Sequence, residues 1–166
     1  MIARKRLAAL AAVAVLATLG AYSRRPAARP PQPVAFTHIA HVAAGLRCMD
    51  CHADASISPR AGLPDVQECV LCHTRIRTQT PAVRQVLRYA AAGKEIPWRP
   101  VYVIPASAHV RFRHDAHVKA DIACSNCHPA VARETTARVS APLGMGTCVG
   151  CHRRYGAATE CETCHY

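Results

Sequence analysis

Five copies of the pattern Cys-x-x-Cys-His dominate the sequence, at residues 48–52, 69–73, 124–128, 148–152 and 161–165, and they use all ten cysteines. Two thiols at this spacing can bond both vinyl groups of one porphyrin, and the histidine that follows can bind its iron. Disulfide frameworks and zinc ribbons also use paired cysteines, but neither explains a histidine after every second cysteine. The sequence therefore predicts five covalently attached c-type haems. The predicted attachment residues are Cys48, Cys51, Cys69, Cys72, Cys124, Cys127, Cys148, Cys151, Cys161 and Cys164, and the predicted proximal iron ligands are His52, His73, His128, His152 and His165.

The composition is poor in the large side chains that fill a conventional core. The 166 residues include two phenylalanines and one tryptophan. Five porphyrins would then form most of the core, with the polypeptide wrapped around them. We expect a mainly α-helical fold with much irregular structure and no sheet of consequence, which would resemble a multihaem cytochrome c of the class III or c7-like type.

The formal net charge of +11 raises the question of nucleic-acid binding. Five haems would bring about ten carboxylate groups, which offset most of this charge. Arginine is well suited to pair with such carboxylates through its forked guanidinium group. The charge therefore does not predict a nucleic-acid partner, although a basic face could meet an acidic redox protein.

The N-terminal region has the pattern of an export segment. Basic residues at positions 4–6 precede an almost wholly apolar stretch at 7–22, so residues 1–23 are predicted to be a signal or anchor segment. Residues 24–35 are rich in proline and are predicted to form an extended linker. Whether or not the first segment is cleaved, we expect the remaining chain on the periplasmic side of the cytoplasmic membrane, where c-type haem is attached.

The rest of the chain contains an internal duplication. Phe-x-His-x-x-His occurs at residues 36–41 and again at 112–117, and each copy is followed by six residues and a haem motif. The offset is 76 at every matched position. We therefore predict one pentahaem domain at 36–166, made of module 1 (36–73), a connector (74–111), module 2 (112–152) and a fifth haem motif (153–166).

The five remaining histidines are candidates for the sixth iron ligands. Two i, i+3 pairs, His38 with His41 and His114 with His117, place both rings of each pair on one side of a helical turn, from which they can reach two irons. The duplicated phenylalanines are expected to pack on porphyrin edges. The fifth haem has two candidate ligands, His109 and Met145, and residue counting alone slightly favours His109.

The connector is predicted to begin with a helix. Thr80 can cap it, Pro81 suits its first position, and Gly93 suits its end. Beyond it lies the only tryptophan, Trp98, which either packs against a haem or contacts a partner protein.

Several of these stretches, in the same order and spacing, resemble one known family. Residues 36–64, the Ile-Pro-Trp at 96–98, the approach to 112–118, and residues 141–146 leading into the fourth motif are similar to the multihaem cytochrome c subunit of alternative complex III and its relatives. The resemblance implies a membrane-anchored pentahaem subunit. Its partners would be quinol-oxidising and iron–sulfur subunits, and a downstream cytochrome or terminal oxidase. It also implies a methionine at the position of Met145, which makes His109 and Met145 equal candidates.

Six-coordinate haems have no open coordination position, so the sequence predicts an electron carrier with no substrate chemistry of its own. One alternative is a free periplasmic electron shuttle. The other is a multihaem reductase in which one haem lacks a sixth ligand. No cluster of acid and base residues adjoins any motif, which disfavours the reductase.

Overall fold

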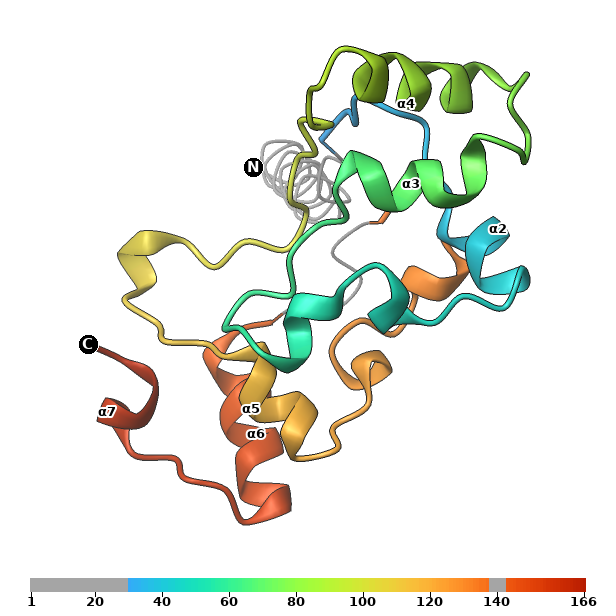
Figure 1. Cartoon of the computed structure of the whole chain (residues 1–166). Coiled ribbons are helices and arrows are strands. Elements are labelled where there is room, and N and C mark those ends of the chain that lie inside the picture. Colours follow the sequence, from blue (N-terminus) through green and yellow to red (C-terminus); the bar gives the residue numbers. More distant parts are fainter. Residues whose placement is uncertain (1–29, 138–142) are drawn as a thin grey trace, which may run out of the picture.

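The computed structural model describes residues 30–137 and 143–166, and this part of the chain is built from short helices joined by irregular segments (Figure 1). Its only β pairing is an isolated antiparallel bridge between Val110 and His165. The expected mainly helical fold, without a sheet, is confirmed. The α-helices are α2 (His38–Ala43), α3 (Val66–His73), α4 (Pro81–Ala91), α5 (His114–Lys119), α6 (Met145–Tyr155) and α7 (Cys161–Cys164), and the 3-10 helices are η1 (Cys48–Asp50), η2 (Ala53–Ser56), η3 (Ala106–Ala108), η4 (Cys124–Asn126) and η5 (Val131–Arg133).

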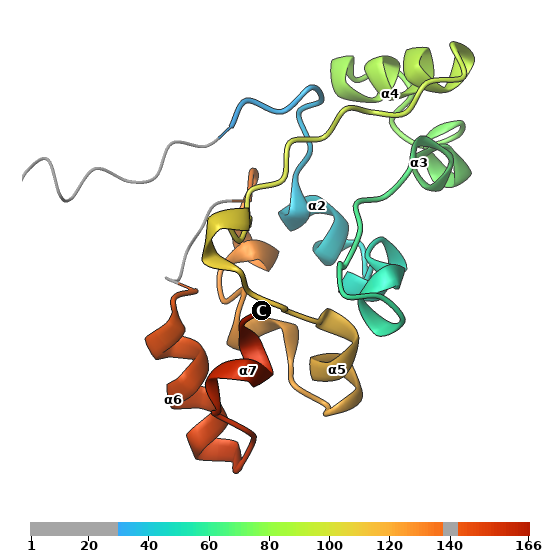
Figure 2. The ribbon, with the colours of Figure 1, turned by 90° about the vertical axis from the view of Figure 1, so that its left-hand side faces the viewer.

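The order of elements repeats along the chain. Helices α2 and α5 begin at the first histidine of each Phe-x-His-x-x-His, and η1 and η4 begin at the first cysteine of the first and third motifs. The second and fourth motifs lie on the longer helices α3 and α6, whereas the fifth lies on α7. Figures 1 and 2 place α3 and α4 at one end of the molecule, α6 and α7 at the other, and α2 and α5 between them.

Helix α4 has the termini that the sequence predicts. The Thr80 side chain accepts a hydrogen bond from the Val83 amide at 3.4 Å, and Pro81 occupies the first turn. Gly93, just beyond the helix, adopts a left-handed φ of 61°. Val83 and Val86 are buried, so the apolar face packs inward against α3.

The hydrophobic core of the described residues is small and lies at one end. Val34, Val66, Val86 and Ile96 form its buried cluster, with Trp98 packed against them. Val34 is only 3% exposed, and the nearby Gln32 side chain bonds the backbone of Arg99. Composition placed residues 30–34 in a linker, but the chain is already packed against the folded unit there. Trp98 contacts protein side chains, and its ring centre lies 6.2 Å from that of Phe36.

Residues 1–29 and 138–142 lie outside the described residues, and with them the predicted signal or anchor segment and most of the predicted linker. Among the residues that are described, none of the helices is both long and apolar enough to cross a bilayer.

Candidate haem-binding sites

Each motif presents one exposed and one partly exposed cysteine. Burial raises the pKa of the Cys69 thiol to about 11, and nearby Cys51 adds to this effect. Burial likewise raises the pKa of Cys48, Cys51, Cys127 and Cys148. The surroundings of these five cysteines therefore lack the depressed pKa that is typical of nucleophilic cysteine sites.

Most of the histidines are oriented by a backbone carbonyl. In seven of the ten, Nδ1 lies within hydrogen-bonding distance of a carbonyl oxygen, and this leaves Nε2 on the far side of the ring. Such a partner fixes the tautomer and orientation of a metal-binding imidazole. The carbonyls belong to Thr37 (for His41), Gly62 (His52), Ile76 (His73), Pro59 (His114), Arg113 (His117), Ala158 (His152) and Ala108 (His165).

These carbonyls are the part of the site that the sequence did not reveal. A backbone oxygen can come from any residue type, so the pattern carries no signal for it. Gly62 is the exception, because here the residue type itself is required by the loop that supplies the carbonyl. Its φ of 70° is left-handed, and a Cβ atom there would lie 2.7 Å from Oδ2 of Asp54, so only glycine fits the loop that holds His52.

Three predicted distal histidines each face a motif histidine. The ring centres are 5.9 Å apart for His41 and His73, 6.5 Å for His114 and His128, and 6.1 Å for His117 and His152. Two metal–nitrogen bonds of about 2 Å, with roughly 1 Å from each nitrogen to its ring centre, give a separation of about 6 Å. The three pairs therefore fit a haem iron held between two imidazoles.

Of the four paired histidines, only His38 has not yet been matched to a motif. The first motif is the one without a partner, and the surroundings of His38 are consistent with a role as its distal ligand. Its Nδ1 atom is buried without a hydrogen-bond partner. Burial lowers its pKa, and nearby His52 and His41 lower it further, against an opposing effect of Glu134. A neutral imidazole is the form that binds a metal.

Each duplicated phenylalanine packs against its own histidine pair. Phe36 stacks on His41 with ring centres 4.5 Å apart, and Phe112 stacks on His117 at 4.8 Å. Both also meet the first histidine of the pair edge-on. The phenylalanines therefore support the rings of the predicted iron ligands, and their packing on porphyrin edges stays a prediction.

The two modules pack reciprocally. Helix α5 of module 2 contacts η2, which follows the first motif, and α2 of module 1 contacts η5, which follows the third. The amide and Nδ1 of His114 both bond the carbonyl of Pro59. The buried carboxylate of Asp115 forms two ion pairs. Its Oδ2 atom lies 2.8 Å from the guanidinium nitrogen Nη2 of Arg113 and 3.4 Å from Nζ of Lys119. The Arg113 hydrogen bonds are the main cause that lowers the pKa of Asp115 to about 2, so this inter-module contact contains an ionised acid.

The five attachment sites form a row. The Cys69 thiol neighbours Cys51, which puts the second motif beside the first. The Cys124 thiol is close enough to Cys48 to raise its pKa further, so the first motif adjoins the third. The Cys127 thiol neighbours those of the fourth motif, and Cys148 neighbours Cys164 of the fifth. The helices agree with this order, because α2 and α5 each carry two of the predicted distal ligands, which are expected to serve neighbouring motifs. The spatial order is second, first, third, fourth, fifth.

The fifth motif is held by the connector. The Nδ1 atom of His165 lies 3.1 Å from the Ala108 carbonyl, and Val110 pairs with His165 in the bridge. His109 stands beside this bridge and packs its ring edge-on against Tyr166, with ring centres 5.6 Å apart. The backbone of His109 has a left-handed φ of 49°, and its carbonyl accepts a hydrogen bond from the Tyr166 amide at 3.2 Å.

Met145 is the first residue of α6 and is 72% exposed. The spacing from Met145 to Cys148 and on to His152 places all three on one face of the helix. Since the Cys148 thiol neighbours Cys164, this face leads from the fourth site to the fifth. Met145 thus lies on the α6 face that carries Cys148 and His152 of the fourth motif, and this face adjoins Cys164 of the fifth motif.

Comparison with known families gives two matches that together cover most of the chain. Residues 20–95 match the model of the class III cytochrome c family, and residues 110–166 match that of cytochrome c7 and related cytochromes c. With the mainly helical fold and the paired histidines, these matches show that the two parts of the chain are similar to multihaem c-type cytochromes of the class III and c7-like type. The similarity supports covalently bound haem c and electron transfer.

A curated relative adds a narrower comparison. The chain is 35% identical over 105 residues to the multiheme cytochrome c subunit of menaquinone reductase from Nitratidesulfovibrio vulgaris strain Hildenborough. The aligned region covers 62% of this chain and 48% of the relative. The chain thus spans about half the length of that protein.

Proposed function

We propose that the chain carries five haems and conducts electrons along its length, as the cytochrome subunit of a quinone-linked membrane complex at the periplasmic face. The observation that carries this proposal is the row of five attachment sites, in which each motif adjoins the next. Haem c supplies one-electron iron chemistry when bound. The chain's own residues hold each site in position and set its ligands, burial and nearby charge.

The proposed ligands combine the motifs with the paired histidines. His38 and His52 would serve the first haem, His41 and His73 the second, His114 and His128 the third, and His117 and His152 the fourth. His165 and Met145 would serve the fifth. A thioether ligand raises the reduction potential relative to imidazole, so the fifth haem would have the highest potential in the row.

The quinone link rests on resemblance. The curated relative is a subunit of a menaquinone reductase, and the sequence resembles the cytochrome subunit of alternative complex III. Both resemblances support iron–sulfur and quinone-binding subunits as partners. A downstream cytochrome or oxidase would be the second partner with which the chain exchanges electrons. Residues 1–23 would supply the membrane attachment.

The test is haem content and spin state in the purified protein. We expect five haems per chain by the pyridine haemochrome method and only low-spin signals by EPR. Co-purification with quinone-binding and iron–sulfur subunits is expected from membranes. Recovery as a soluble protein without such subunits would favour a free shuttle, and a high-spin haem in the wild type would favour a reductase.

The fifth ligand is tested by a pair of variants. Met145→Ala is expected to leave one haem five-coordinate, so that the reduced protein binds about one equivalent of carbon monoxide per chain. His109→Ala is expected to bind none, because His109 faces Tyr166. The reverse pattern would assign the fifth haem to His109. Equal, full low-spin content in both variants would exclude both residues.

A further inference from the structure

The two modules hold equivalent histidines in different ways. The offset of 76 residues relates His38 to His114, and these residues begin α2 and α5. The amide and Nδ1 of His114 both bond the carbonyl of Pro59. The Nδ1 atom of His38 is buried and has no hydrogen-bond partner among the residues that the structure describes. His38 therefore lacks the carbonyl that supports the ring of its counterpart.

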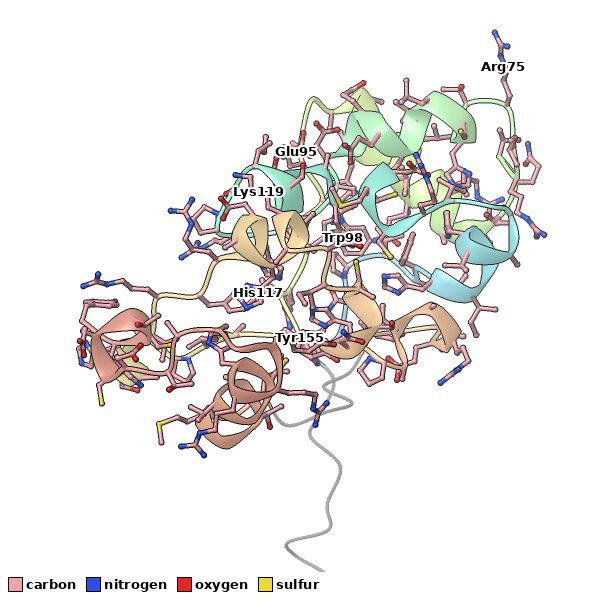
Figure 3. The ribbon with its side chains drawn as sticks, turned by 90° about the horizontal axis from the view of Figure 1, so that it is seen from below. Arg75, Glu95, Trp98, His117, Lys119 and Tyr155 are labelled. Atoms are coloured by element: carbon pink, nitrogen blue, oxygen red, sulfur yellow. The ribbon has the colours of Figure 1, made fainter. Side chains whose placement is uncertain are left out.

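A buried carboxylate lies near the His38 ring. Within the described ranges, Asp115 and Glu134 are the two buried acidic residues, and the ion pairs given above account for Asp115. Glu134 directly follows η5, which lies beside α2 in Figures 1 and 3 and packs against it. Burial and two neighbouring histidines lower the pKa of His38, whereas Glu134 raises it. The carboxylate of module 2 thus acts on a ligand ring of module 1.

This acidic residue is present in one copy of the duplication only. Glu134 stands six residues after the motif histidine His128, and the residue six positions after His52 is Ser58. Ser58 has a neutral side chain, and its carbonyl accepts the amide of Asp115 at 3.2 Å. The carboxylate therefore occurs where the neighbouring histidine lacks a carbonyl, and it is absent where the histidine has one.

We propose that Glu134 takes the place of the missing carbonyl and that its negative charge lowers the reduction potential of the first haem. The inference rests on the proposed function, which assigns His38 to that haem. A ferric haem carries one more positive charge than a ferrous one, so a nearby anion stabilises the oxidised form.

The carbonyl on His114 acts in the same direction at the third haem. A hydrogen bond from Nδ1 makes an imidazole more basic, which also stabilises the oxidised iron. The two copies would thus reach a low potential by different means, through a hydrogen bond in one and through a charge in the other. Because Glu134 comes from module 2, the potential of the first haem would depend on the contact between the modules.

The test is a redox titration of the holoprotein followed by EPR, in which the first haem is the low-spin signal that His38→Ala removes. Glu134→Gln keeps the shape of the side chain and removes its charge. It is expected to favour the reduced first haem about tenfold, which is an upward shift of about 59 mV in one midpoint potential. Glu134→Asp keeps the charge and is expected to stay closer to the wild-type potential than Glu134→Gln.

The matched control is Glu162→Gln, the same chemical change at an exposed residue of α7. It is expected to leave the reduction equilibrium of the first haem within about twofold of wild type, because solvent screens an exposed charge. An unchanged first haem in Glu134→Gln would overturn the proposal. Equal shifts in Glu134→Gln and Glu162→Gln would also overturn it, and so would a larger shift in Glu134→Asp than in Glu134→Gln, which would indicate a role in packing.

His38→Ala separates this proposal from the ligand assignment beneath it. One high-spin haem in that variant supports the assignment of His38 as a ligand. An unshifted first haem in Glu134→Gln would then refute the role of Glu134 alone. Five low-spin haems in His38→Ala would refute the assignment itself, and the role of Glu134 with it.

Discussion

Replacing His117 with alanine is expected to convert the fourth haem from low-spin to high-spin. The ring of His117 lies 6.1 Å from that of the motif residue His152, and its Nδ1 bonds the Arg113 carbonyl at 2.7 Å, so its Nε2 is the atom left to bind iron. Loss of this ligand should open one site to carbon monoxide and raise its potential by on the order of 0.1 V.

The measurements are EPR of the oxidised protein and carbon monoxide titration of the reduced one. His41→Ala should give the same result at the second haem, because His41 pairs with His73 in the same way. Phe112→Leu is the control. It removes the ring stacked on His117 but keeps the ligand, so all haems should stay low-spin. Five low-spin haems in His117→Ala would refute the proposed pairing.

Gly62→Ala is expected to lower the free energy of unfolding of the holoprotein by about 2 kcal/mol. The new Cβ atom would meet Oδ2 of Asp54 at 2.7 Å and its Cβ at 3.3 Å, in a residue with a φ of 70°. The loop must shift, and with it the carbonyl that orients His52. We therefore also expect an altered EPR signal from the first haem.

The control for this variant is Gly93→Ala. Gly93 has a similar φ of 61° but open space around its Cβ position, so only the backbone strain of about 1 kcal/mol applies. Thermal unfolding followed by circular dichroism compares the two. Equal destabilisation, or an unchanged first haem in Gly62→Ala, would contradict the role assigned to the Asp54 contact.

The sequence predicted the parts of this structure that depend on local pattern. The motifs, the i, i+3 histidine pairs and the cap and stop of α4 all follow from spacing within a few residues. These features need no knowledge of the rest of the chain.

Long-range contacts could not be predicted, because they do not depend on the spacing of residues within a short stretch. Nothing local indicates that Pro59 holds His114, 55 residues away, or that Ala108 holds His165, 57 residues away. The burial of Val34 against α3 and α4 was hidden as well, because its proline-rich surroundings are typical of linkers. The spatial order of the motifs differs from their order in the sequence because the modules meet through the first and third motifs.

The reciprocal packing of the two modules also constrains how the protein matures. Cys48 and Cys124 face each other where the modules meet, and each module places a helix against the segment that follows the other's first motif. Because each module completes a packed surface of the other, we expect module 1 to stay incompletely packed until module 2 has been synthesised. Neither half is therefore expected to mature as an independent unit.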